Sequence, residues 1–229
     1  MKTSKKKIFI ACDTANIKIV KNIIHNSKVK KIKVGYKFGL EFLNSKNGRN
    51  FISNLKNKII FLDVKLNDIP NTMRSAVLAL KDLKANYLTV HISSGLQSLK
   101  AVKKVCGKTK IVGVTTLTSL DKKDLKEIGY DKSLKKLVIH QAKLANKANL
   151  DALVCSALEV KYVKKFFKKE VITPGIKLFK SNTDQKRIAS PKDAFFKYKS
   201  DWIVIGRSIT NGNIKKNLNY LINQIIKNN

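Results

Sequence analysis

The sequence has few residues of several kinds, and each shortage excludes a class of protein. No apolar run approaches the roughly 18 residues that a membrane-spanning helix needs. The amino-terminal segment MKTSKKKIFIAC has only five apolar residues in a row, fewer than the roughly 7–15 of a secretory signal core. Three cysteines, Cys12, Cys106 and Cys155, lack metal-ligand spacing, and their odd number fits reduced thiols. We therefore expect a soluble cytoplasmic protein with no membrane partner.

Acidic residues and arginines are also scarce. Only 15 Asp and Glu stand against 48 Lys and Arg, giving a formal net charge of +33, and just four of the basic residues are arginines. Arginine clamps phosphates and reads guanine with its planar fork, so nucleic-acid readers usually contain plenty of it. The lysines are spread along the whole chain, and no nucleic-acid-binding motif accompanies them. We therefore expect a solvated cationic surface that attracts anionic substrates and no specific nucleic-acid partner.

Short apolar runs alternate with amphipathic helical patterns along the chain. The runs are rich in Val and Ile and apolar on both faces, as in buried parallel strands. They predict eight strands, at residues 8–13, 31–35, 58–65, 86–91, 110–116, 151–155, 170–174 and 201–206. The helical patterns cover residues 16–26, 38–56, 70–84, 94–106, 131–147, 158–167, 191–199 and 214–227.

The order of these elements predicts the fold. No linker rich in Gly, Ser or Pro divides the chain, and no GxGxxG turn follows the first strand, as an open nucleotide-binding sheet would have. Eight unbroken βα units instead favour a closed barrel. We expect residues 1–229 to form one (β/α)8 barrel domain.

In such a barrel the chemistry takes place at the carboxyl ends of the strands. The third predicted strand runs into DVKLND, residues 63–68. Period-two alternation places Asp63 and Lys65 on one face, with Asp68 in the loop beyond. Two carboxylates around Lys65 would favour its ammonium form, which suits proton donation to a carbanion. From this pattern alone, a salt bridge that ties the strand to its loop remains an equal alternative.

The last predicted strand ends in Gly206 and Arg207. The backbone N–H groups of these two residues would open a short helix, which favours an anion. The guanidinium fork of Arg207 matches phosphate oxygens. The sequence therefore predicts a phosphate site at this point of the barrel mouth.

The stretch FLDVKLNDIPNT, residues 61–72, resembles the hallmark segment of the orotidine 5'-phosphate decarboxylases, which catalyse the last step of de novo pyrimidine synthesis. Six further segments resemble landmarks of the bacterial-type members in the same order: IACDTAN, KIKVGYKFG, VTTLTSL, VCSALE, VITPGIK and WIVIGRSIT. The resemblance covers essentially the whole chain. It implies a homodimeric (β/α)8 barrel that converts orotidine 5'-monophosphate to uridine 5'-monophosphate and CO2, with neither a metal nor another cofactor.

The resemblance also implies roles for matching residues. Lys65 would protonate C6 of the pyrimidine after CO2 leaves, and its ammonium lies where negative charge develops. Asp63 would lie beside the departing carboxylate. Asp68, with Thr72 nearby, would reach into the partner subunit, so that the two chains share their sites.

The substrate's ribose and base would be held by residues of other strands. The resemblance implies that Asp13 and Lys33 pair and bind the ribose hydroxyls, which makes Lys33 part of the charged array. Thr118 and Ser119 would face the pyrimidine ring.

The phosphate would be bound by Gly206 and Arg207, and Gln185 lies in the loop that closes over phosphate and base in this family. Lys177 stands where the family usually has an arginine after TPGI. Lysine keeps the charge but loses the bidentate fork, so Lys177 is a further binding candidate.

Two other functions remain open at this point. A magnesium-dependent sugar-phosphate decarboxylase or aldolase of the same suprafamily would share the D-x-K-x-x-D pattern, although the resemblance to those enzymes stops before IPNT and VIGRS. A non-catalytic barrel that binds nucleic acid would use the +33 charge. It would not explain the acidic residues at the ends of the first and third strands.

Overall fold

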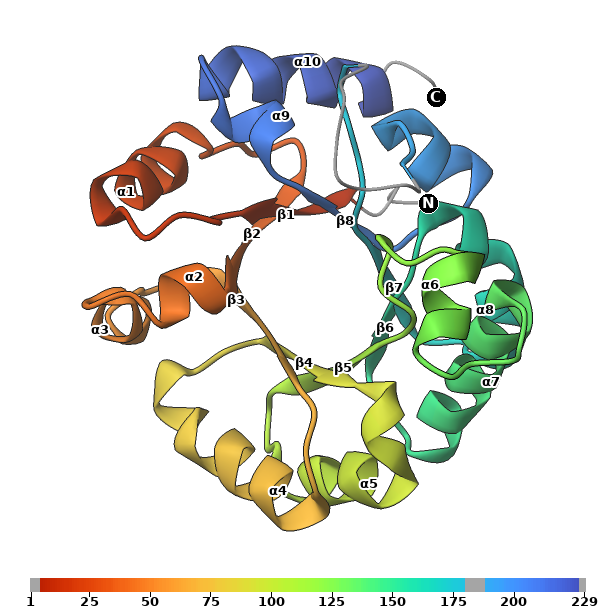
Figure 1. The fold of residues 1–229 in the computed structure, drawn as a ribbon. Coiled ribbons are helices and arrows are strands. Elements are labelled where there is room, and N and C mark those ends of the chain that lie inside the picture. Colours follow the sequence, from red (N-terminus) through yellow and green to blue (C-terminus); the bar gives the residue numbers. More distant parts are fainter. Residues whose placement is uncertain (1–4, 180–187, 227–229) are drawn as a thin grey trace.

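Eight parallel strands close into a barrel with helices around it in the part of the chain that the structure describes, residues 5–179 and 188–226 of a computed structural model (Figure 1). The strands follow one another round the barrel in sequence order, and the last strand pairs with the first. The predicted (β/α)8 barrel is confirmed.

The strands are short and almost continuously buried. They are β1 (Lys7–Ala11), β2 (Lys33–Gly39), β3 (Ile59–Leu66), β4 (Tyr87–His91), β5 (Lys110–Val114), β6 (Ala152–Val154), β7 (Glu170–Thr173) and β8 (Trp202–Ile205). Because helices cover one face and the barrel interior covers the other, both faces of these strands carry apolar side chains.

The helices form the outer ring seen in Figure 1. They are α1 (Ile17–Asn26), α2 (Leu40–Leu43), α3 (Gly48–Ser53), α4 (Pro70–Ala79), α5 (Gly95–Val105), α6 (Lys122–Glu127), α7 (Leu134–Lys147), α8 (Val160–Phe166), α9 (Arg207–Thr210) and α10 (Ile214–Ile226). Short 3-10 turns occupy Lys81–Leu83, Ile92–Ser94 and Ala157–Glu159, and a π turn occupies Asp193–Lys197.

Local sequence explains where several helices begin. The Asn16 side chain accepts hydrogen bonds from the first backbone N–H groups of α1, which satisfies donors that have no partner within the helix. Pro70 occupies the first turn of α4, where its missing N–H costs nothing. Asp121 and Asp124 form a reciprocal capping box at the start of α6.

The amino-terminal end of the barrel is closed by aromatic and charged side chains. The rings of Phe9 and Trp202 stack with centroids 4.1 Å apart. Glu170 accepts hydrogen bonds from Lys7 at 2.7 Å, from Lys110 at 2.7 Å and from the Trp202 indole at 3.1 Å. Because these groups fill the floor, the space for a ligand lies at the opposite end of the strands.

The second strand departs from its prediction. It runs to Gly39, whereas the sequence pattern predicted a strand over residues 31–35 and a helix over 38–56. Tyr36 pairs with Ile10 of β1, and Phe38 pairs with Leu62 of β3. Pairing on both sides extends the strand, and only α2 and α3 remain of the predicted helix.

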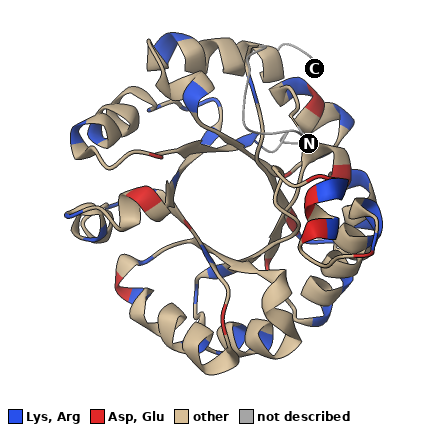
Figure 2. Cartoon of the chain, viewed as in Figure 1, with Lys and Arg blue, Asp and Glu red and all other residues tan. Residues whose placement is uncertain are grey.

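Basic residues lie on helices all round the barrel and are not gathered on one side (Figure 2). This distribution agrees with a solvated cationic surface. Within the described ranges, no helix is both long and apolar enough to cross a bilayer.

Candidate active site

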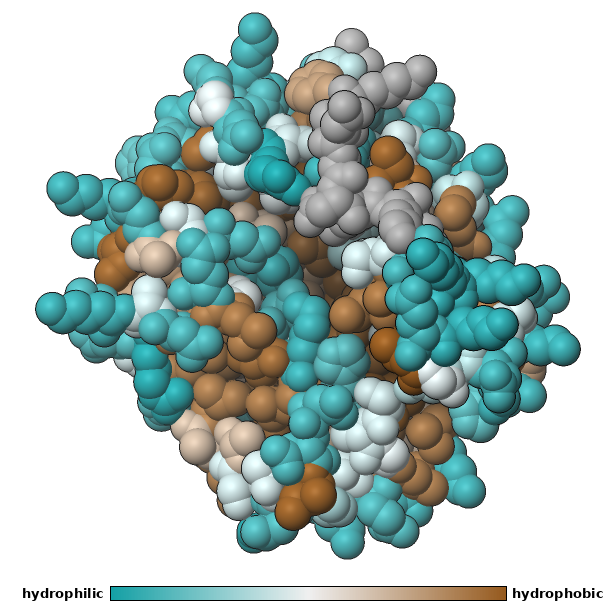
Figure 3. Space-filling model, viewed as in Figure 1, coloured by the Kyte–Doolittle hydropathy of each residue, from teal (hydrophilic) through white to brown (hydrophobic). Residues whose placement is uncertain are grey.

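A cavity of about 950 Å³ opens at the carboxyl ends of the strands. Figure 3 shows this face of the molecule, with hydrophilic side chains along much of its outline. The residues that line the cavity come from most of the strand ends and include Asp13, Lys37, Asp63, Lys65, Thr118, Lys177, Gly206 and Arg207. The position agrees with the mouth of the barrel, where such enzymes carry out their chemistry.

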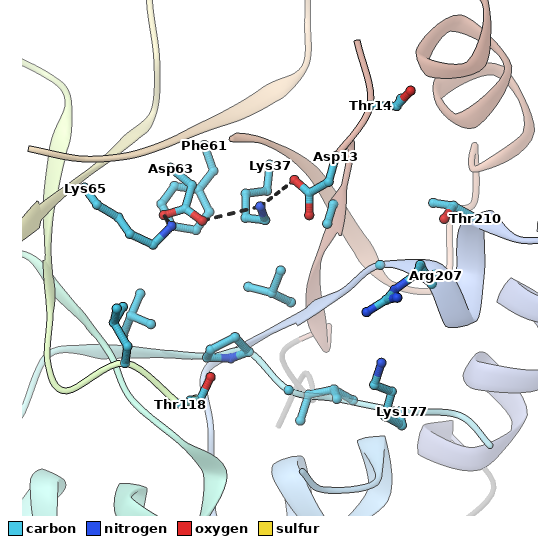
Figure 4. A pocket seen from close by; sticks show the side chains of 18 of the residues that line it. Asp13, Thr14, Lys37, Phe61, Asp63, Lys65, Thr118, Lys177, Arg207 and Thr210 are labelled. Atoms are coloured by element: carbon cyan, nitrogen blue, oxygen red, sulfur yellow. Dashed lines mark hydrogen bonds and ion pairs between the residues drawn. The ribbon is translucent and has the colours of Figure 1, made fainter. Parts of the chain in front are cut away.

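Four charged side chains of alternating sign form a row along one wall of the cavity (Figure 4). The Lys37 Nζ lies 2.8 Å from Asp13 Oδ1 and 3.4 Å from Asp63 Oδ2. The Lys65 Nζ lies 2.9 Å from Asp63 Oδ1. The row therefore runs Asp13, Lys37, Asp63, Lys65, and we call it the charged row.

The two inner members of the charged row stabilise each other's ionised form. Burial alone would lower the pKa of Lys37, but Asp63 and Asp13 more than offset burial and raise that pKa above its usual value. Burial alone would raise the pKa of Asp63, but Lys37 and Lys65 reverse this and hold that pKa below its usual range. Lys37 and Asp63 are thus both charged at neutral pH.

The lysine that pairs with Asp13 is Lys37, and the prediction that Lys33 does so is wrong. Lys33 is the first residue of β2, exposed and paired in register with Lys7 at the other end of the barrel. The error follows from the misplaced end of β2. The signal was available in the sequence, because VGYKF continues the apolar pattern beyond Gly35 with Lys37 near its end.

Asp63 and Lys65 both face the cavity, as the alternation predicted. Within the described chain, the carboxylate that contacts the Lys65 ammonium is that of Asp63. Asp68 is exposed, and its Oδ1 accepts a hydrogen bond from the backbone N–H of Ile69. Thr72 is exposed on α4. Neither Asp68 nor Thr72 lines the cavity of its own chain.

Basic groups occupy the side of the cavity opposite Lys65. Figure 4 shows Arg207 and Lys177 extending toward the same space, at a distance from Asp63 and Lys65. Arg207 opens α9, directly after β8 and Gly206. The two ends of the cavity therefore differ in charge. The charged row, with acidic and basic side chains, lies at one end, and the basic residues Arg207 and Lys177 lie at the other.

Of the remaining residues that the sequence predicted for the site, some line the cavity and others do not. Thr118 lines the cavity, whereas Ser119 is exposed and does not. Gln185 lies outside the described residues. The hydroxyl of Thr89, which the sequence did not single out, contacts both Asp63 and the backbone of Lys65.

Two reactive residue types near the site have perturbed titration. Burial and, to a lesser extent, the adjacent Asp13 raise the pKa of the Cys12 thiol to about 12 against the opposing effect of Lys37, so Cys12 is not a nucleophile. Burial lowers the pKa of His91, at the end of β4, and the Lys65 ammonium lowers it further against the opposing effect of Asp63. His91 is therefore neutral at physiological pH.

Metal ligands do not gather in the described part of the chain, where no three His, Cys, Asp or Glu side chains lie close enough to hold an ion. Asp13 and Asp63 are the carboxylates of the charged row, and the Lys37 ammonium already lies between them. These two carboxylates therefore already bind an ammonium group of the protein itself.

Comparison with known proteins shows the family of this chain. Residues 6–217 match the model of the orotidine 5'-phosphate decarboxylase / HUMPS family. The chain is 46% identical to the orotidine 5'-phosphate decarboxylase of Wolbachia pipientis subsp. Culex pipiens over 78% of this chain and 81% of that protein. It is 38% identical to the orotidine 5'-phosphate decarboxylase of Buchnera aphidicola subsp. Acyrthosiphon pisum over 89% of both chains.

A solved structure is also similar. The crystal structure of orotidine 5'-phosphate decarboxylase from Lactobacillus acidophilus has a TM-score of 0.83 and 28% sequence identity, over 97% of this chain and 100% of that one. The family match covers nearly the whole barrel, from before β1 into α10. The chain belongs to the orotidine 5'-phosphate decarboxylase / HUMPS family.

Proposed function

We propose that this chain decarboxylates orotidine 5'-monophosphate to uridine 5'-monophosphate and CO2, the last step of de novo pyrimidine synthesis. The observation that carries the proposal is the charged row at one end of the cavity, with Arg207 and Lys177 at the other. A nucleotide with a carboxylated base at one end and a phosphate at the other matches this division of charge.

The Lys65 ammonium is the proton donor in this proposal. The bond between C6 and the carboxylate carbon breaks, CO2 leaves, and the electron pair stays on C6. A proton then passes from Lys65 Nζ to C6, and the resulting amine regains a proton from solvent. The ammonium lies beside the developing negative charge throughout, which is where a fixed cation lowers the barrier most.

Asp63 has two tasks beside this lysine. Its carboxylate holds the Lys65 ammonium at 2.9 Å, and the substrate carboxylate would bind close to it. Lys37 and Lys65 keep Asp63 ionised, so the substrate carboxylate and Asp63 repel each other. This repulsion is lost when the substrate carboxylate leaves as neutral CO2.

The ribose and the base lie between the two ends of the cavity. We assign the ribose hydroxyls to Asp13 and Lys37, which replaces Lys33 in this role. Thr118 lines the cavity and is assigned to the pyrimidine ring. Ser119 is also assigned to the ring, although its side chain is exposed in this chain alone.

The phosphate is assigned to Arg207, Gly206 and Lys177. A guanidinium fork binds two phosphate oxygens at once, and Lys177 adds a second positive charge. Gln185, which lies outside the described residues, is also assigned to the phosphate.

A homodimer with shared sites accounts for the placement of Asp68 and Thr72. Both are exposed and do not line their own chain's cavity. The apolar side chain of Ile69, next to Asp68 and just before α4, is 65% exposed as well. In the proposed dimer, this segment packs against the second copy and contributes Asp68 and Thr72 to the partner's cavity.

The proposed enzyme needs no metal or other cofactor, and we place it in the cytoplasm as one domain. Its three cysteines are buried thiols, which supports a reducing compartment.

A spectrophotometric assay of orotidine 5'-monophosphate in the presence of EDTA tests the proposal. We expect conversion to uridine 5'-monophosphate that EDTA does not inhibit and that Lys65→Ala abolishes while keeping the wild-type circular dichroism spectrum. No turnover by folded wild-type protein would overturn the proposal. Activity that appears only with added Mg²⁺ and a sugar phosphate would favour the magnesium-dependent alternative.

A further inference from the structure

The backbone of β3 is irregular at Asp63 and Lys65, which we call the catalytic pair. Phe61 and Leu62 pair with Tyr87 and Leu88 of β4, but the next pairing joins Leu66 to Val90. Residues 63–65 of β3 therefore lie opposite the single residue 89 of β4. Such a bulge bends the strand and redirects its side chains, and bulges are common beside active sites.

Lys65 adopts a left-handed conformation within this bulge, with φ of 49°. A non-glycine residue in that region is strained and persists only where the surroundings hold it. In a regular strand, the backbone N–H of Lys65 would donate a hydrogen bond to a backbone carbonyl of the neighbouring strand. The bulge removes that partner, so another acceptor is required.

Thr89 supplies the acceptor. Its side chain is fully buried, and its Oγ1 accepts a hydrogen bond of 2.8 Å from the backbone N–H of Lys65. The same hydroxyl lies 3.1 Å from Asp63 Oδ1 and 3.5 Å from the Leu62 carbonyl. A hydroxyl has one proton, and the ionised carboxylate is the nearer and charged acceptor, so Thr89 donates to Asp63.

One hydroxyl thus holds both members of the catalytic pair. It fixes the backbone from which the Lys65 side chain extends, and it fixes the carboxylate that orients the Lys65 ammonium at 2.9 Å. Thr89 itself does not line the cavity. We propose that Thr89 is a positioning residue for the proton transfer: its hydroxyl holds Lys65 and Asp63 in the geometry that the reaction needs. This proposal rests on the proposed function of the site.

The role predicts a loss of turnover without a loss of substrate binding. Thr89→Val keeps the shape of the side chain and removes the hydroxyl, which leaves the Lys65 N–H without its acceptor and removes one hydrogen bond from the Asp63 carboxylate. We expect kcat to fall about 100-fold, since a displacement of about 1 Å in a reacting group has an effect of this size. KM should change by less than about threefold, because Thr89 is outside the cavity.

Two variants separate positioning from a general loss of stability. Thr89→Ser keeps the hydroxyl and should retain kcat within about threefold of the wild type. Thr115→Val is the matched control. Thr115 is a buried threonine just beyond β5 whose hydroxyl donates to the Val154 carbonyl at 2.8 Å, and it does not line the cavity. The Thr115→Val variant should lose stability, as Thr89→Val does, but should keep the kcat of the wild type.

The experiment is steady-state kinetics of the full-length variants with orotidine 5'-monophosphate, alongside wild type and Lys65→Ala. Retained kcat in Thr89→Val, or an equal fall in Thr115→Val, would overturn the role of Thr89. Should Thr89→Val not fold, Thr89→Cys replaces it, because a thiol is a weak donor, and a kcat equal to that of Thr89→Ser would contradict the proposal. No turnover by the wild type would instead overturn the proposed function, and the role of Thr89 with it.

Discussion

Lys37, near the end of β2, and Asp13, in the loop after β1, form an ion pair of 2.8 Å. The same ammonium lies 3.4 Å from Asp63 at the end of β3. Lys37 and Asp63 are both largely withdrawn from solvent, with side chains 11% and 15% exposed. One lysine therefore balances two carboxylates that belong to different strands.

Replacing Lys37 should damage both the fold and the reaction. Lys37→Ala leaves Asp63 buried with one cation fewer, and removing one partner of such a pair costs about 3 kcal/mol in the free energy of unfolding. We expect kcat/KM to fall about 100-fold as the charged row loses its geometry. Urea unfolding and steady-state kinetics measure the two effects.

Lys33→Ala is the control for Lys37→Ala. Lys33 is an exposed residue at the other end of the same strand, so its loss should change stability by less than about 0.5 kcal/mol. A fall in activity in Lys33→Ala equal to that in Lys37→Ala would contradict the assignment of Lys37.

Arg207→Ala should chiefly raise KM. A charge-assisted hydrogen bond to phosphate contributes about 1.5–3 kcal/mol, so KM should rise about 10- to 100-fold while kcat changes less. Arg49 offers a control, since it is exposed, pairs with Asp82 and does not line the cavity. An unchanged KM in Arg207→Ala, measured over a full substrate titration, would remove this residue from the phosphate site.

Mixing two inactive variants tests the shared site. Asp68→Asn chains and Lys65→Ala chains should each be inactive alone. In a mixed dimer, one site combines an intact Lys65 with the partner's intact Asp68. Random exchange in a two-fold dimer should restore about a quarter of the wild-type activity. No recovery, with exchange demonstrated by native mass spectrometry, would count against shared sites.

Glu170 should make stability depend on pH in the acid range. Burial alone raises the pKa of Glu170, but hydrogen bonds from Lys110, Lys7 and Trp202 reverse this and lower the pKa from 4.5 to about 2. A carboxyl whose pKa is depressed in the folded state stabilises the fold above its unfolded pKa. That stabilisation is lost as pH falls from about 4.5 toward about 2.

Glu170→Gln should therefore be less stable than the wild type by about 2 kcal/mol at pH 7, and the difference should shrink toward pH 3. Urea unfolding of both proteins between pH 3 and pH 7 measures it. Glu127→Gln provides the reference, because Glu127 forms a solvent-exposed pair with Lys123, which contributes little. A difference between wild type and Glu170→Gln that does not vary with pH would show that the hydrogen-bonded charge is not the cause.

The alternation of apolar runs and helical patterns was sufficient to predict the barrel. Strands buried on both faces have a composition that few other folds require, and the order of the elements did the rest. The same alternation placed Asp63 and Lys65 together on one face of β3, and the structure places both in the cavity.

The sequence failed where an element's end depended on its neighbours. Residues 38–56 carry a helical pattern, yet Phe38 pairs with Leu62 in the sheet, and α6 formed where no helix was predicted. The end of β2 decided which lysine meets Asp13. Periodicity gives the face of a residue but not its distance from the strand's end, and Lys33 and Lys37 share one face.

The sequence by itself determined the fold class, the family and the residue types of the catalytic pair, because these depend on local pattern and on an ordered set of motifs. Tertiary structure alone decided that Lys37 completes the charged row and that Thr89 holds Lys65 and Asp63. These contacts join residues 24 to 26 positions apart. They arise only when β1 to β4 lie side by side, because strand register and a bulge bring the side chains within hydrogen-bonding distance.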